Sequence, residues 1–234
     1  MMVKAIDLAK TALWGLVGVM VLAGCSAVAD LEPVDQGALQ EDAVLPGLDG
    51  LEGQCPVLEM GLVSGRELPE VKERKVCGHP YPYTIAGING RNPVSFNTDA
   101  KINCVMATQL QRYFADSVQP MALSMLRQPV VEVRVAASYS CRTRNSKRGA
   151  KLSEHAKMNA FDMSALTLAD GTVLTIEDDW HSMGRKGRFL RAINRSACRY
   201  FTTVIGPGGD KYHQDHLHLD HGRHGRKGTW RSCQ

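Results

Sequence analysis

Two short stretches near the C-terminal end contain the residues best suited to metal chemistry. The first covers residues 153–162 and includes His155 and Asp162, and the second covers residues 213–218 and holds three of the eight histidines. Zinc takes imidazole and carboxylate ligands, usually four in a tetrahedron, and a catalytic site leaves one position to water. We therefore predict that His155, Asp162 and one histidine of the second stretch bind Zn²⁺, which leaves the other histidines for acid–base work.

Both stretches resemble motifs of the zinc D-Ala-D-Ala peptidases, a group that includes the penicillin-insensitive murein endopeptidase. The group's first motif is Ser-x-His-x-x-Gly-x-Ala-x-Asp, matched here by Ser153, His155, Ala160 and Asp162. Met158 stands where that motif has glycine. The second motif is His-x-x-His-x-His, matched by His213, His216 and His218.

A closer likeness is to the bacterial extensin-like C-terminal family, which looks like a branch of the same group. It covers roughly residues 55–220 and is carried by residues 139–162, 189–191 and 206–208 together with the histidine stretch. Each motif alone is moderately specific, and the two together in this order make a strong resemblance.

The resemblance implies a role for each residue of the two motifs. Zinc would be held by His155, Asp162 and His218. Of the other two histidines, His213 is the candidate base for the attacking water and His216 would stabilise or protonate the tetrahedral intermediate, although these two roles could be exchanged.

Three further residues near the motifs have candidate roles. Arg142 resembles an arginine that helps to hold the reacting carbonyl oxygen, with Arg144 as its competitor and a surface position as the alternative. Asp215 could orient a histidine from outside the ligand set or simply cap its turn. Ser153 reads in the same way as a turn hydroxyl beside the site.

These roles describe a zinc metallopeptidase that cleaves peptide bonds, expected to contain D-amino acids, in peptidoglycan. Two alternatives from other classes stay open. One is a wall-binding lipoprotein whose metal site is vestigial, and the other is a domain in which zinc is purely structural. A fourth coordination position open to water would favour the enzyme over both alternatives.

Local patterns predict the elements that position these residues. Alternating apolar residues at 131–135 indicate a half-buried strand that leads to Arg142. His155 and Asp162 are spaced for one helix face, but we favour a turn that leads into a strand. His216 and His218 would point the same way along a strand, so that His213 can reach the metal only if the chain bends near Gln214.

The remaining patterns complete an α+β fold, a small antiparallel sheet flanked by helices with the zinc site at the sheet. We expect a helix capped by Thr98 or Asp99, a short helix at 120–126 and a helix at 187–198. Strands are expected at 172–176 and 201–205. We interpret the acidic cluster at 177–179 beside His181 as the rim of a loop rather than as a rival metal site. We interpret His221 and His224 as solvated rather than as ligands.

The N-terminal part reads as an export and anchoring segment. A charged start, an apolar run too short for a span of about 20 residues and a break at Cys25 resemble a lipoprotein signal over residues 1–24. Residues 25–54 would be the acylated cysteine and an acidic disordered tether, followed by the domain at 55–234. Because Ser26 follows the cysteine, we expect anchoring in the outer membrane, facing the periplasm.

The cysteines and the charge agree with this compartment. Six cysteines remain besides Cys25, and in an oxidising compartment they favour three disulfides of undetermined pairing: Cys55, Cys77, Cys104, Cys141, Cys198 and Cys233. The net charge is +4, with the basic residues gathered after residue 141. We expect peptidoglycan peptides as partners, no nucleic acid, and a monomer.

Overall fold

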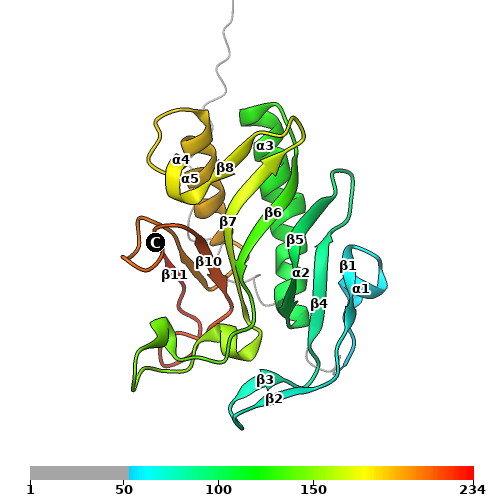
Figure 1. Ribbon diagram of the computed structural model, residues 1–234, viewed down its shortest axis with the longest axis vertical. Helices are drawn as coiled ribbons and strands as arrows, with labels where there is room; N and C mark the ends of the chain where they lie inside the picture. The colour runs from blue at the N-terminus through cyan, green and yellow to red at the C-terminus, as the bar shows by residue number, and fades with distance from the viewer. Residues whose placement is uncertain (1–52) are drawn as a thin grey trace, which may run out of the picture. The chain divides into compact units, whose positions relative to one another are not determined.

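A mixed sheet of nine strands forms the centre of the part of the chain that the structure, a computed structural model, describes, residues 53–234 (Figure 1). Along the sheet the strands lie in the order β1 (Val63–Glu67), β4 (Tyr83–Ile88), β5 (Val94–Ile102), β6 (Val130–Ala137), β7 (Ala160–Leu168), β10 (Leu217–Asp220), β9 (Thr203–Ile205) and β11 (Ser232–Cys233). The short strand β8 (Val173–Thr175) pairs with β7. A separate hairpin is formed by β2 (Val71–Glu73) and β3 (Cys77–His79).

The α+β class is confirmed, but the prediction of a small antiparallel sheet is wrong. The sheet is larger, and β5 pairs with β6 in parallel, as β9 does with β11. The parallel pair has a clear origin, because the chain leaves β5 through α2 (Cys104–Tyr113), the π-helix η1 (Phe114–Val118) and α3 (Gln119–Leu126) before it enters β6. A helical crossover of this kind returns the chain in the same direction.

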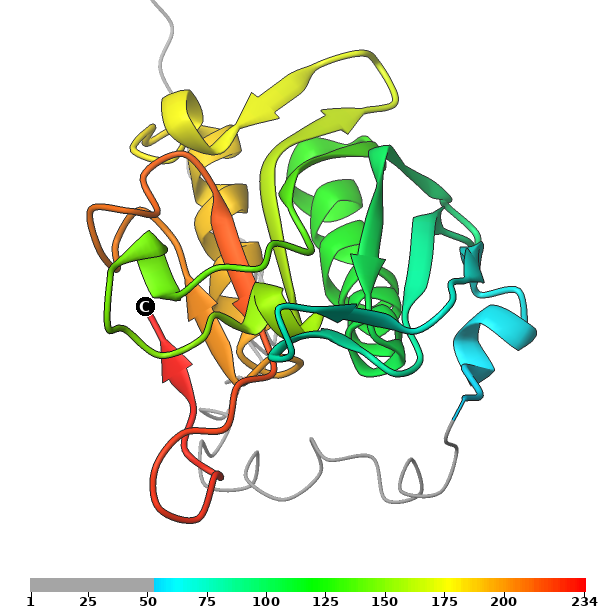
Figure 2. The same cartoon turned by 60° about the horizontal axis from the view of Figure 1, so that its bottom comes forward.

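Helices α2 and α3 and the later α5 (Arg185–Ala197) pack together against the sheet (Figure 2). The Tyr113 hydroxyl of α2 donates a hydrogen bond of 3.1 Å to the carbonyl oxygen of Ile193 in α5. Four short helical segments lie outside this layer: α1 (Pro56–Glu59), η2 (Arg144–Ser146), η3 (Glu154–Lys157) and α4 (Ile176–Asp179). The predicted helices at 120–126 and 187–198 correspond to α3 and α5.

The predicted start of the first long helix is wrong. Residues 94–102 form strand β5, in which Phe96 and Ala100 are buried while the three residues between them are exposed. The helix cap is Asn103, whose side-chain oxygen accepts a hydrogen bond of 2.8 Å from the Met106 amide. An asparagine at this position satisfies an amide that has no partner within the helix.

The acidic cluster at 177–179 lies in the short helix α4 rather than in a loop. Its carboxylates bind the preceding strand end, since Asp179 accepts a hydrogen bond from the Thr175 amide and Asp178 one from the Thr175 hydroxyl. The strand expected at 172–176 is β8, and the one expected at 201–205 begins two residues later, as β9.

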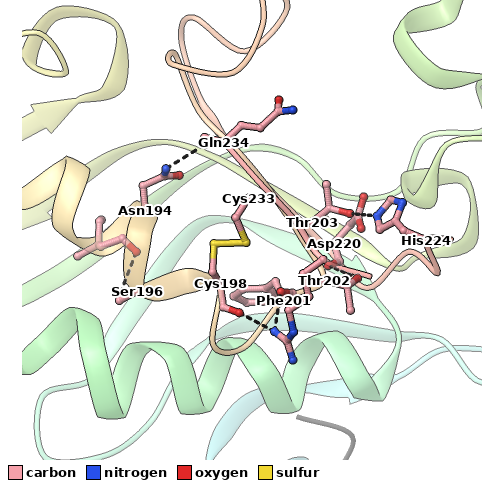
Figure 3. The surroundings of a disulfide bond; sticks show 12 residues. Asn194, Ser196, Cys198, Phe201, Thr202, Thr203, Asp220, His224, Cys233 and Gln234 are labelled. Carbon is pink, nitrogen blue, oxygen red and sulfur yellow. Dashed lines mark hydrogen bonds between the residues drawn. A yellow bond between two sulfur atoms is a disulfide. The ribbon is translucent and has the colours of Figure 1, made fainter. Parts of the chain in front are cut away.

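Three disulfides are present, as predicted, and the structure supplies their pairing: Cys55–Cys104, Cys77–Cys141 and Cys198–Cys233. The last one joins the end of α5 to β11 (Figure 3). Around it, Asn194 donates a hydrogen bond of 3.1 Å to the Gln234 carbonyl oxygen. The bridge and this bond fix the C-terminal strand at the sheet edge next to β9.

The predicted signal segment, the acylated Cys25 and the acidic tether fall outside the described residues, apart from the last two tether positions. Within residues 53–234, no helix has the length and apolar character that a membrane crossing requires.

Candidate metal centre

Two antiparallel strands, β7 and β10, bring Asp162 and His218 directly opposite each other. Side chains alternate along a strand, so that Phe161 and Leu219 of the neighbouring pair enter the apolar core. Asp162 and His218 therefore point to the other face of the sheet. Both are at least nine-tenths buried, because the segment that joins β6 to β7 covers this face (Figure 2).

His155 reaches the same place from a turn, η3, immediately before β7. The Ser153 hydroxyl caps this turn by accepting a hydrogen bond of 3.3 Å from the His155 amide. The turn ends at Met158, whose φ of 56° lies in the left-handed region. This region favours glycine, but here a fully buried methionine adopts it. The prediction of a turn leading into a strand is confirmed.

His155, Asp162 and His218 form the only group of metal-ligand type found among residues 53–234. One ligand atom of each lies within 4.8 Å of the others. His155 Nε2 is 3.0 Å from Asp162 Oδ2, and His218 Nδ1 is 2.7 Å from Asp162 Oδ1. The two imidazole nitrogens are 3.2 Å apart. The structure thus contains a possible His/Asp metal-binding group at the sheet.

The outer hydrogen bonds of the two rings decide which nitrogen faces the centre with a lone pair. His155 Nδ1 lies 2.5 Å from the Ser138 carbonyl oxygen, which only accepts, so Nδ1 carries the hydrogen. His218 Nε2 lies 2.9 Å from Asp220 Oδ2 and donates in the same way. With a metal bound and these tautomers kept, two lone pairs and the Asp162 carboxylate would converge without a shared hydrogen, a donor set that fits a zinc ion.

The charges at the centre also favour a bound cation. Burial by itself would raise the pKa of Asp162, but hydrogen bonds from His155 and His218 outweigh it and hold the pKa well below its usual range. Burial likewise lowers the pKa of His218, yet Asp162 and Asp220 together raise it to about 10. Without a metal, His218 therefore binds a proton at neutral pH, in the place that a cation would take.

His213 approaches the centre from the loop before β10. Its ring centroid is 5.5 Å from that of His218, and its Nδ1 donates to Asp210 Oδ1 at 2.6 Å. The other nitrogen, Nε2, is therefore the basic one. The loop bends as predicted, because the Gln214 side chain donates to the carbonyl oxygens of Pro207 and Asp210. Burial lowers the pKa of His213, an effect that Asp210 opposes in part, and favours the neutral ring.

His216 precedes β10 and faces the same centre. Its Nε2 is 3.7 Å from Asp162 Oδ2, and its ring centroid is 5.0 Å from that of His213. Nδ1 donates to Asp215 Oδ1 at 2.7 Å, so Asp215 lies where it could orient this ring. Its carboxylate is 65% exposed, which makes it a weaker constraint than the buried Asp220.

A cavity of about 240 Å³, here called the metal cavity, opens onto the group. His155, Asp162, His218 and His213 line it, and so do both Arg142 and Arg144. The choice between the two arginines as the electrophile therefore remains open. Neither makes an ion pair with a residue of the described chain.

Three hydrogen-bond acceptors at the site were not foreseen: Asp210, Asp220 and the Ser138 carbonyl. Asp220 had a detectable signal, because a carboxylate two residues after His218 faces the same side of a strand. Asp210 is three residues before His213, a spacing that suits a turn. A main-chain carbonyl such as that of Ser138 leaves no mark on the sequence.

The interpretation of His221 and His224 as solvated is wrong, since both are half-buried. The His221 ring packs against Phe201, with centroids 5.6 Å apart, and burial lowers its pKa to about 4. His224 Nε2 lies 2.6 Å from the Thr203 hydroxyl (Figure 3). Neither of them belongs to the metal-binding group.

Fold and site together define a disulfide-bonded α+β domain with a buried His/Asp group that suits a metal ion. The family model described as "Extensin-like protein C-terminus" matches residues 55–234. The chain therefore belongs to this family, as its motifs predicted. The comparison with curated proteins and the comparison with solved structures each found no match.

Proposed function

We propose that this protein is a zinc-dependent hydrolase that cleaves peptide bonds of peptidoglycan. The observation that carries the proposal is the pair of histidines beside the metal-binding group. His213 and His216 each have Nδ1 bound to a carboxylate, which leaves Nε2 without a hydrogen. The His213 ring centroid lies 5.5 Å from that of His218, and His216 Nε2 lies 3.7 Å from Asp162 Oδ2. A purely structural zinc site has four protein ligands and no need of bases next to them.

In this mechanism His155 Nε2, Asp162 and His218 Nδ1 would hold the metal. Bound zinc would polarise the scissile carbonyl group and lower the pKa of water toward about 7. His213 Nε2 takes the proton of the attacking water, while Asp210 stabilises the resulting imidazolium. His216, with Arg142 or Arg144, faces the negative charge that develops on the carbonyl oxygen. The exchange of roles between His213 and His216 is compatible with the geometry, since both are within reach of the group.

Peptidoglycan as the substrate and a lipid anchor at Cys25 belong to the proposal as well. They are supported by the sequence motifs and by the three disulfides, which form in oxidising compartments such as the periplasm. Acylation of Cys25 would attach the chain to the outer membrane, with residues 26–54 between the anchor and the domain. We expect the protein to act there as a monomer, without binding nucleic acid.

The test is incubation of zinc-loaded protein with purified sacculi, followed by identification of the released fragments by mass spectrometry. Wild-type protein should release peptides, and His213→Gln at equal zinc content should not. The alternative is a wall-binding lipoprotein with a vestigial or structural metal. It replaces the hydrolase if the zinc-loaded wild type releases nothing but co-sediments with the sacculi.

A further inference from the structure

A second cavity, of about 430 Å³, lies next to the metal cavity. Four cationic side chains line it: Arg144, Lys151, Lys157 and Arg223. Glu154 is the one acidic residue that the described chain contributes to its lining. We call this space the basic cavity.

The basic cavity shares a wall with the metal cavity. Arg144 and Glu154 line both spaces. His155 on η3 lines the metal cavity, whereas Asn159, just after this turn, lines the basic cavity. At the end of β10, Asp220 lines the metal cavity and the next residue, His221, lines the basic cavity. A peptide bound at the metal centre would therefore have a neighbouring residue within reach of the basic cavity.

The acidic residue does not neutralise the cluster. Glu154 is buried and already bound, since Oε1 accepts a hydrogen bond of 2.8 Å from Lys157 and Oε2 one of 2.8 Å from Asn159. Its charge is balanced by Lys157. Arg144, Lys151 and Arg223 form no ion pair with any residue in 53–234. A concave surface lined by charges of one sign concentrates the field and attracts ligands of the opposite sign.

The main chain holds two of these cations opposite each other. A bridge between Thr143 and Leu152 closes the loop, and the Arg144 amide donates a hydrogen bond of 2.9 Å to the Lys151 carbonyl oxygen. Two like charges held opposite each other in this way repel. An anion between the two side chains would remove that repulsion.

The third cation, Arg223, packs against a glycine. A Cβ atom on Gly228 would lie 2.6 Å from Arg223 Nε and 3.1 Å from its Nη2. The guanidinium group therefore packs against Gly228, which has no side chain to push it away. A planar guanidinium suits the two oxygens of a carboxylate.

We propose that the basic cavity binds a carboxylate of the peptide substrate, on a residue next to the bond that is cleaved. The proposal rests on the hydrolase function for its ligand, but the cavity itself can be tested without any hydrolysis. In this proposal Arg144, Lys151 and Arg223 surround the carboxylate, and these three residues select acidic peptides.

The first test measures binding of glutarate, a dicarboxylate, by isothermal titration calorimetry, with neutral glutaramide as the reference. Glutarate should bind and glutaramide should not, both before and after zinc is removed. The double variant Lys151→Gln/Arg223→Gln should bind glutarate about tenfold more weakly or worse, since it loses two charge-assisted contacts. Arg188→Gln/Arg195→Gln removes the same charge from exposed positions on α5 and should bind like the wild type. Equal losses in both double variants, or binding only with zinc present, overturn the proposal.

The second test compares hydrolysis of two peptides that differ only in a free or amidated carboxylate next to the cleaved bond. The wild type should prefer the free carboxylate in kcat/KM, and the cavity variant should lose that preference while it still cleaves the amidated peptide. If the protein cleaves nothing yet binds glutarate, the hydrolase proposal fails and the anion site stands. If the wild type cleaves both peptides equally, the hydrolase stands and this inference fails.

Carboxylates could also come from the chain itself, since residues 26–54 are acidic. Replacing the acidic residues of that segment by Asn and Gln in the full chain separates the two sources. If the substrate is the ligand, the affinity for glutarate stays at the wild-type value. A several-fold gain in affinity would show that the segment occupies the cavity, and would overturn the assignment to the substrate.

Discussion

The metal-binding group and the two remaining histidines differ in how the chain holds them. Asp162 and His218 lie on paired strands with both residues buried, and His155 lies on a capped turn directly before one of those strands. His213 and His216 lie in the loop between β9 and β10, fixed by side-chain contacts from Asp210, Asp215 and Gln214.

In the proposed function, this difference would separate metal binding from proton transfer. Metal ligands must keep distances within a few tenths of an ångström, which backbone pairing and burial provide. Groups that transfer protons must approach the substrate and change their hydrogen bonds during turnover, which a loop allows. The strand residues should therefore control zinc affinity, and the loop residues should control rate at constant zinc content.

The largest effect should come from the strand group. Asp162→Asn or His218→Ala removes one of three ligands, so zinc affinity should fall by about 1,000-fold or more. His181→Ala, an exposed histidine outside the group, serves as the control and should keep wild-type affinity. Competition with a chromophoric chelator measures all three variants. If Asp162→Asn and His218→Ala retain zinc as well as the His181→Ala control does, these strand residues are not ligands and the distinction from the loop residues fails.

The loop histidines should show the opposite pattern. His213→Gln and His216→Gln should each retain about one zinc per chain, whereas the loss of proton transfer should slow hydrolysis about 100- to 10,000-fold. Metal content by mass spectrometry and initial rates on muropeptides give the two numbers from one preparation. A variant that loses zinc and activity together would instead place its histidine among the ligands.

Zinc affinity should also depend on pH in a defined direction. The pKa of His218 in the metal-free protein is raised to about 10, so below that pH zinc must displace a proton from this ring. Affinity should therefore rise with pH by about tenfold per unit for one proton released. Calorimetry in buffers of different ionisation enthalpy counts the protons. Release of no proton at pH 7 would contradict the raised pKa of His218 in the metal-free protein.

The smallest effect concerns the turn that holds His155. Met158→Ala removes a fully buried side chain and should cost about 2–5 kcal/mol of the free energy of unfolding. Met158→Gly loses the same packing but relieves the left-handed backbone, which is worth about 1 kcal/mol. The glycine variant should therefore be more stable than the alanine variant in urea denaturation. The reverse order would mean that the turn is not strained at this residue.

Local patterns predicted much of this molecule. The alternation at 131–135 and the apolar spacing of α5 marked their elements, and the paired motifs marked the family before any contact was visible. The turn at His155 followed from the motif resemblance together with Asn159, Phe161 and Met163. The bend at Gln214 followed from the need for His213 to reach the same centre as His218.

What the sequence left open depends on contacts between distant segments. The parallel pairing of β5 with β6 and the extra strands of the sheet are set by tertiary packing, and helix and strand signals compete at residues 98–102, where burial of Ala100 and Ile102 favours the strand. The role of Ser138 depends on a main-chain oxygen, and the half-burial of His221 depends on Phe201. The pairing of the six cysteines also required the fold.

The most direct test is X-ray absorption spectroscopy of the zinc-loaded protein, because multiple scattering from imidazole rings counts the histidine ligands. The account predicts two imidazoles, from His155 and His218, one carboxylate, and a remaining light-atom ligand that exchanges with added inhibitor. His213→Gln and His216→Gln should leave the spectrum unchanged. Three or four imidazoles in the wild type, with one lost in either of these variants, would show a closed structural site and contradict the separation between strand ligands and loop bases.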